Sequence, residues 1–137
     1  MSEKIIIIGA SGFAKEVYEV LMNTLQWAEK SNTFIGFLDD NESLHGNNFM
    51  DSKVLGGLDW LLENQNTKIV LGIGSPSIKS KIVNKISKIG DFEYITLIDS
   101  NVVLGKDVRV GKGVFIGAGT VITTNIDIED FVTINLA

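Results

Sequence analysis

The 137-residue sequence contains no cysteine, a single proline and a single histidine. The absence of cysteine excludes disulfide bonds, thiol catalysis and thiolate metal sites. One histidine is too few for a histidine-rich metal site, so we expect no metal centre. That histidine, His45, lies in the polar stretch NESLHGNN, where we expect a solvated loop.

Long apolar runs and an excess of positive charge are also missing. No apolar stretch approaches 18 residues, so the sequence predicts no membrane-spanning helix. The N-terminal segment MSEKIIIIGAS is too short for the core of a signal peptide, and we expect a first strand there and a cytoplasmic protein. The net charge of −5 argues against a nucleic-acid partner, because phosphate binding requires a basic surface.

Residues 4–97 alternate between patterns typical of strands and of helices. The run KIIIIG at residues 4–9 is typical of a strand buried on both faces of a parallel sheet. Ser11 can cap a following helix, whose apolar face contains Ala14, Val17, Leu21 and Leu25. Further strands are expected at residues 34–38, 68–73 and 92–98, with a short helix at residues 58–62. The alternation predicts a small α/β domain with right-handed crossovers.

A second helix is predicted after Pro76, because isoleucines recur at helical spacing at positions 78, 82, 86 and 89. Lysines lie between them at positions 79, 81, 85 and 88. Lys79 is one turn into this helix, within reach of a phosphate. Four lysines on one helix nevertheless favour the interpretation of a solvated basic face.

From Ile98 onward an aliphatic residue returns at every sixth position: Ile98, Leu104, Val110, Ile116, Ile122, Ile128 and Ile134. A strict period of six fits neither a helix nor a simple strand, but it fits the triangular coil of a left-handed β-helix. We expect the sixfold residues to stack inside the coil at about the 4.8 Å strand spacing. Gly105, Gly111 and Gly117 follow three of them, and we expect these glycines to carry the backbone around the corners.

Taken in order, the motifs GASG, FLDD, VLGG and GIGS, followed by hexapeptide repeats, resemble the sialic acid O-acetyltransferase and UDP-amino-sugar N-acetyltransferase family. The resemblance implies an α/β Rossmann-like N-terminal domain at residues 1–97. It implies a short, truncated left-handed parallel β-helix at residues 98–137. It also implies acetyl transfer from acetyl-CoA to a UDP-linked or sialic-type sugar in bacterial surface-glycan synthesis, by an assembly that is a trimer in the family.

The resemblance also implies the residues of a substrate site: Ser11, Gly12, Phe13, Asp39, Asp40 and Gly74. A glycine turn that opens a helix favours a phosphate or another anion. Carboxylates at the end of the second strand accept hydrogen bonds from sugar hydroxyls or from a base N–H. For each feature a purely structural role stays open: the glycines shape a turn, and Asp40 caps the next segment.

The family's catalytic histidine has no counterpart in the sequence, and we expect it to lie beyond Ala137, together with most of the acetyl-CoA site. We therefore expect the chain to be inactive by itself, either as a truncation of a longer enzyme or as a natural short form. Two alternatives remain: a fragment of an NAD-dependent oxidoreductase, and a non-catalytic module for nucleotide-sugar binding or assembly. The sequence does not name the sugar or choose between O- and N-acetylation.

Overall fold

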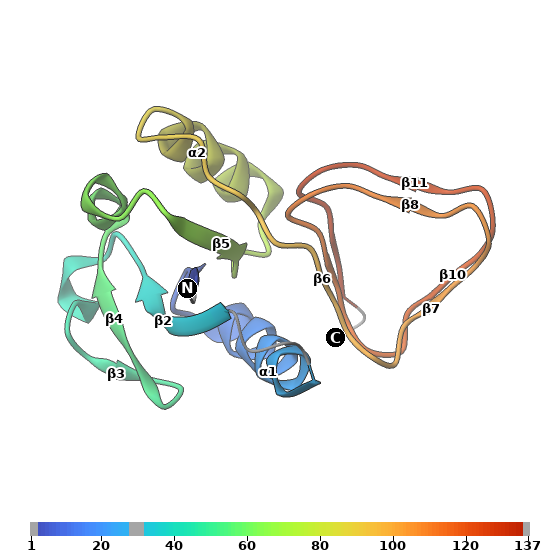
Figure 1. Cartoon of the computed structure of the whole chain (residues 1–137), viewed down its shortest axis with the longest axis horizontal. Helices are drawn as coiled ribbons and strands as arrows, with labels where there is room; N and C mark the ends of the chain where they lie inside the picture. The colour runs from blue at the N-terminus through green and yellow to red at the C-terminus, as the bar shows by residue number, and fades with distance from the viewer. Residues whose placement is uncertain (1–2, 28–31, 136–137) are drawn as a thin grey trace.

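The computed structural model describes residues 3–27 and 32–135. An α/β domain and a triangular coil lie side by side, joined by the segment that leads into β6 (Figure 1). Neither described helix is long and apolar enough to cross a membrane.

A five-stranded sheet forms the centre of the first domain, in the order β3-β4-β2-β1-β5. Its strands are β1 (Glu3–Ile8), β2 (Asn32–Leu38), β3 (Asn48–Phe49), β4 (Ser52–Gly56) and β5 (Thr67–Leu71). All neighbours pair in parallel except β3, which is antiparallel to β4. The apolar run of β1 is fully buried because β1 lies inside the sheet and is covered on both faces.

Two helices cover opposite faces of this sheet. Helix α1 (Gly12–Trp27) packs on the face that carries Ile5 and Ile7, and its Ala14, Val17 and Leu21 are buried there. Helix α2 (Pro76–Ser87) packs through Ile82 and Ile86 on the other face. Successive strand residues point to opposite faces, so the unbroken isoleucine run of β1 supplies both cores. Short 3₁₀ helices, η1 (Glu42–Leu44) and η2 (Leu58–Glu63), flank β3 and β4.

The predicted strand at residues 92–98 is wrong. Tyr94 forms only a single parallel bridge with Ile69 at the edge of the sheet. The next strand, β6 (Leu97–Ile98), pairs with the coil instead. The apolar character that suggested one strand reflects two separate burial sites, since Phe92 packs under α2 and Leu97 under α1. The division of the chain at residues 97 and 98 stays a prediction.

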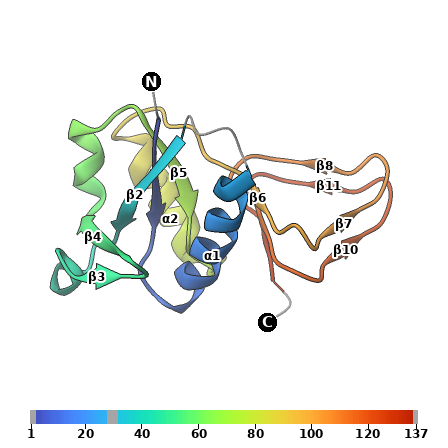
Figure 2. The same ribbon diagram turned by 60° about the horizontal axis from the view of Figure 1, so that its bottom comes forward.

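The second domain is a parallel β-helix with a repeat of 18 residues. Its strands are β6, β7 (Val103–Leu104), β8 (Arg109–Val110), β9 (Phe115–Ile116), β10 (Val121–Ile122), β11 (Asp127–Ile128) and β12 (Thr133–Ile134). They form three flat sides, β6-β9-β12, β7-β10 and β8-β11. Figure 2 shows the stacked turns from another side, next to α1. The prediction of a short left-handed β-helix after an α/β domain is confirmed.

The sixfold residues form the apolar interior of the coil. Ile116, Ile122 and Ile128 of the middle turn are buried, and Ile98, Val110 and Ile134 pack against them. Leu104 pairs in register with Ile122 and so shares its side of the strand. It is 40% exposed because it belongs to the first turn, which has a neighbouring turn on one side only.

The role expected for the repeat glycines requires a correction. The left-handed corner positions are Asp107, Gly113, Gly119, Asn125 and Phe131, and they also recur every six residues. Gly105 has no such backbone angle. Instead, a Cβ at Gly105 would lie 2.8 Å from the carbonyl carbon of Thr123 in the next turn. Glycine is needed there because adjacent turns approach closely, not because the backbone is left-handed.

Candidate functional site

The carboxyl ends of β1 and β5 mark a topological switch point. These strands are neighbours, but the chain leaves them for helices on opposite faces of the sheet. Open α/β sheets bind ligands in the crevice that such a divergence leaves. A cavity of about 330 Å³ lies there, lined by Ile8, Gly9, Ser11, Leu38, Asp39, Asp40, Leu58, Ile73, Gly74, Ser75, Ile78 and Ile82. We call this cavity the switch-point cleft.

Four of the six residues expected in a substrate site line the cleft: Ser11, Asp39, Asp40 and Gly74. Gly12 is exposed and is the first residue of α1. Phe13 is not among the lining residues. Its ring meets Phe115 of the β-helix edge-on, with ring centroids 5.2 Å apart. The ligand contacts expected of these residues stay predictions.

Asp39 ties together two of the loops that border the cleft. One carboxylate oxygen accepts a hydrogen bond from the Ala10 amide at 3.0 Å, and the other accepts one from the Asn41 amide at 2.9 Å. The carbonyl of Asp39 lies 2.6 Å from Nε2 of His45. Asp39 therefore holds the glycine turn after β1 against the end of β2.

Asp40 is exposed and is less fully engaged. Its Oδ1 accepts a hydrogen bond from the Leu58 amide at 2.9 Å, at the start of η2. A Cβ at Gly57 would lie 2.7 Å from this same oxygen, so the VLGG motif has a packing reason for its second glycine. The structural role of Asp40 uses Oδ1, which leaves Oδ2 for a ligand.

Both helices that leave the switch point begin at the cleft. Ser75 caps α2 by accepting a hydrogen bond from the Ile78 amide, and Pro76 occupies the first turn. The backbone angle φ of Gly9 is 108°, and a Cβ there would lie 2.8 Å from the carbonyl oxygen of Gly72. Only glycine fits this close approach between the β1 and β5 loops. The unpaired N–H groups of two helix N-termini favour an anion in the cleft.

The expectation of a solvated histidine is wrong. His45 is half-buried, and its ring nitrogen bonds to the carbonyl of Asp39. The expectation of a solvated Lys79 is also wrong, because this side chain is only 4% exposed. Neither contact has a signal in the sequence, because both partners are backbone carbonyls brought close by the fold.

Sequence reasoning also missed the apolar wall of the cleft. Ile78 and Ile82 belong to the isoleucine series of α2, which the spacing assigned to the core. In the structure Ile78 is 51% exposed and Ile82 is half-buried. The position of Ile78 only three residues after the capping Ser75 was the available signal, since the first turn of a helix lies at the sheet edge.

A larger cavity, of about 580 Å³, lies at the opposite, amino edge of the sheet. Its lining mixes carboxylates with Lys4 and Lys68, and Lys68 is engaged by Glu3 at 2.6 Å. That cavity has no helix N-terminus and no switch point, so geometry favours the smaller cleft. Within the described ranges no group of three or more acidic, histidine or cysteine side chains is arranged to hold a metal ion.

Comparison with known sequence families supports the two-domain description. Residues 4–86 match the PglD N-terminal domain, and residues 95–124 match the bacterial transferase hexapeptide repeats. Among curated proteins no sequence match was found.

Several solved structures share the fold. A perosamine N-acetyltransferase from Caulobacter crescentus, solved as a histidine variant with CoA and GDP-perosamine, is 27% identical with a TM-score of 0.80, over 96% of this chain and 60% of that one. The acetyltransferase domain of PglB from Neisseria gonorrhoeae is 25% identical with a TM-score of 0.78, over 98% and 62%. WeeI from Acinetobacter baumannii shares the fold at 24% identity with a TM-score of 0.76, over 94% and 59%.

The chain thus spans about 60% of the length of the structures it matches. Both parts of its fold have counterparts there, in the same order along the chain. The PglD N-terminal match covers more than half of the residues, and the hexapeptide match follows directly. The chain belongs to the family of hexapeptide-repeat sugar acetyltransferases that carry a PglD N-terminal domain.

Proposed function

We propose that the switch-point cleft binds the nucleotide part of a nucleotide-linked sugar that is acetylated in bacterial surface-glycan synthesis. The observation that carries this proposal is the convergence of two helix N-termini and the Asp39–Asp40 pair on one cavity. The helix ends attract the diphosphate, and a free carboxylate oxygen accepts hydrogen bonds from ribose or base. The C. crescentus relative holds GDP-perosamine, which is a ligand of this chemical class.

The lining of the cleft divides the expected contacts between two ends. Ser11 and Gly12 lie where α1 begins, so their amides face an anion. Ile78 and Ile82 supply an apolar wall for the flat face of a base. No lysine or arginine lines the cleft, so the diphosphate would depend on backbone N–H groups and helix dipoles. Binding by such groups is favourable but modest, which predicts affinity in the micromolar to millimolar range.

The reaction that we propose for the family member is transfer of an acetyl group to a sugar amine or hydroxyl. Acetyl-CoA is the cofactor of this family, and related structures contain CoA or acetyl-CoA. The described residues do not fit such a group, since none of the described cavities lies over the β7-β10 side or over β8 of the coil. We therefore assign no residue of this chain to the cofactor.

The general base is also a proposal. A base must reach the proton that it removes from the acceptor. The only histidine of the sequence, His45, is engaged with the Asp39 carbonyl in the α/β domain. We propose that the residues given bind the sugar nucleotide but do not catalyse acetyl transfer by themselves.

We also propose self-association through the coil, as a trimer. Val103 and Val121 pair in register on the β7-β10 side and are 58% and 67% exposed. Their outward apolar side chains favour burial against another copy. Sedimentation velocity tests this: we expect a trimer for the wild type and a monomer for Val121→Glu, and a monomeric wild type would contradict the proposal.

Calorimetric titration with UDP, GDP and UDP-linked amino sugars tests the binding function. We expect heat of binding for at least one sugar nucleotide and a matching rise in the midpoint of thermal unfolding. NAD serves as the control ligand, because a dehydrogenase fragment would bind it in preference. Absence of heat and of any thermal shift at millimolar nucleotide would remove the proposal.

A further inference from the structure

Lys79 is the only buried charged side chain in the described part of the chain, with 4% of its surface exposed. Its neighbours at positions 81, 85 and 88 on the same segment are exposed, as a solvated lysine face requires. Lys79 points away from that face and toward the β-helix. Burial of an ammonium group is unfavourable unless hydrogen bonds replace the lost water, so this position calls for an explanation.

The replacement bonds come from the other domain. The Nζ of Lys79 donates to the carbonyl oxygen of Phe131 at 2.6 Å and also to the hydroxyl of Thr133. The ion pairs found among the described residues involve Lys68 and Arg109, so Lys79 is held by neutral acceptors rather than by a carboxylate. Consistent with its dry surroundings, burial lowers the pKa of Lys79 below the ordinary lysine value.

The acceptor Phe131 occupies the last described corner of the coil. Its φ of 64° lies in the left-handed region, which the other corners fill with Asp107, Asn125 or glycine. A bulky aromatic residue in this region is strained and persists only where its surroundings hold it. Its ring packs edge-on against Tyr94, with centroids 5.0 Å apart, while its carbonyl receives Lys79.

Two other contacts join the domains on the same β6-β9-β12 side. Phe13 packs on Phe115, and Nδ2 of Asn135 donates to Oε2 of Glu16 at 2.8 Å. Phe13 and Glu16 belong to α1 and Lys79 to α2, the helices whose N-termini flank the switch-point cleft. Aromatic contacts alone are non-directional, and Asn135 and Glu16 are exposed, so only the Lys79 bonds are both directional and buried.

We propose that Lys79 is a positioning residue that fixes the orientation of the β-helix relative to the switch-point cleft. The functional value of this orientation rests on the proposed function, because a sugar that projects from a nucleotide in the cleft must meet the coil at a defined place. Lys79 acts through Phe131 and Thr133 and does not line the cleft itself.

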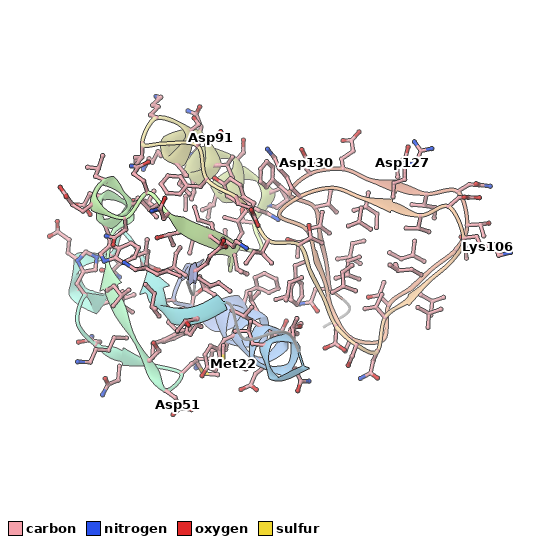
Figure 3. The ribbon with its side chains drawn as sticks, viewed as in Figure 1. Met22, Asp51, Asp91, Lys106, Asp127 and Asp130 are labelled. Atoms are coloured by element: carbon pink, nitrogen blue, oxygen red, sulfur yellow. The ribbon has the colours of Figure 1, made fainter. Side chains whose placement is uncertain are left out.

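Distance measurement between two spin labels tests the proposal directly, because the chain contains no cysteine that would compete for labelling. Lys53→Cys places one label on β4, and Lys106→Cys places the other at the far corner of the coil, which Figure 3 labels. Both native side chains are exposed, so labelling should leave the fold intact. Pulsed electron paramagnetic resonance then reports the distribution of the interdomain distance.

Lys79→Met keeps the length of the side chain but removes the donor, and we expect the distribution to broaden about twofold, since linked domains move unless their interface holds them. Lys81→Met on the exposed face of α2 is the matched control and should keep the wild-type width. Lys79→Arg retains a donor and should restore a narrow distribution. An unchanged distribution in Lys79→Met would overturn the proposal.

If circular dichroism shows that Lys79→Met does not fold, Thr133→Val carries the test, because it removes one acceptor and keeps the side-chain volume. Broadening then supports the role of Lys79, and an unchanged width refutes it. The measurement uses no ligand. Failure of nucleotide binding would therefore remove the proposed function without deciding the distance experiment, and the reverse also holds.

Discussion

The amide of Ala10 donates a hydrogen bond of 3.0 Å to the carboxylate of Asp39, which joins the glycine turn after β1 to the end of β2. The second oxygen of Asp39 accepts the Asn41 amide. In Asp39→Asn one of the two amides would face an NH₂ group instead of an acceptor. We expect a loss of about 1 to 2 kcal/mol in the free energy of unfolding, measured with urea.

The matched control for this change is Glu42→Gln, which removes an exposed carboxylate three residues away. It should leave the free energy of unfolding within about 0.5 kcal/mol of the wild type, as for most surface substitutions. Equal effects of the two variants would show that general charge, not the Asp39 bonds, stabilises this edge of the sheet.

Asp40→Asn separates the structural role of Asp40 from its proposed role in ligand binding. The variant keeps an amide oxygen for the Leu58 N–H but loses the negative charge and the free carboxylate oxygen. We expect little change in the urea midpoint and an approximately tenfold weaker affinity for a sugar nucleotide, the effect of one lost hydrogen bond to a charged group. Unchanged affinity by calorimetry would make Asp40 a capping residue only.

Gly105→Ala tests the close approach of adjacent turns of the coil. The new Cβ would lie 2.8 Å and 2.9 Å from backbone atoms of Thr123 and Thr124, which have no flexible side-chain atom to move away. We expect destabilisation of about 1 to 3 kcal/mol in urea denaturation, as for other overpacked sites. Gly12→Ala is the control, since a Cβ there meets nothing within 4 Å, and it should be close to neutral.

Tyr94 should ionise at unusually high pH, because burial raises its pKa to about 12. An unfolded tyrosine ionises near pH 10, so the native state holds this proton more tightly than the unfolded state does. Stability is therefore fully present below pH 10 and is lost as pH rises from 10 to 12. Ultraviolet titration should show a late ionisation that disappears in Tyr94→Phe, and a native protein whose tyrosines all ionise near pH 10 would contradict this.

The sequence predicted the parts of the fold that depend on periodic burial. Seven aliphatic residues at a spacing of six have one economical solution, and the 18-residue pairing of Leu97 with Phe115 and of Phe115 with Thr133 confirms it. The corner residues were missed because Phe131 is left-handed through its surroundings, not through its own preference.

The candidate site was predictable in position but not in detail. Glycine turns and acidic residues at strand ends indicate the carboxyl edge of a parallel sheet, and Ser11, Asp39, Asp40 and Gly74 meet there. The bonds of His45 and Lys79 were beyond prediction, because each ends on a carbonyl oxygen that carries no mark in the sequence. Contacts between domains depend on their final packing, which local patterns do not encode.

The most direct test of nucleotide binding at the switch-point cleft is an amide chemical-shift titration of the ¹⁵N-labelled protein with UDP and GDP. The account predicts saturable shifts of the amides at residues 9–13, 39–41 and 74–75, with small changes along β7 and β10. Shifts confined to the amino-edge cavity around Lys4 and Lys68, or no shifts at millimolar nucleotide, would contradict it.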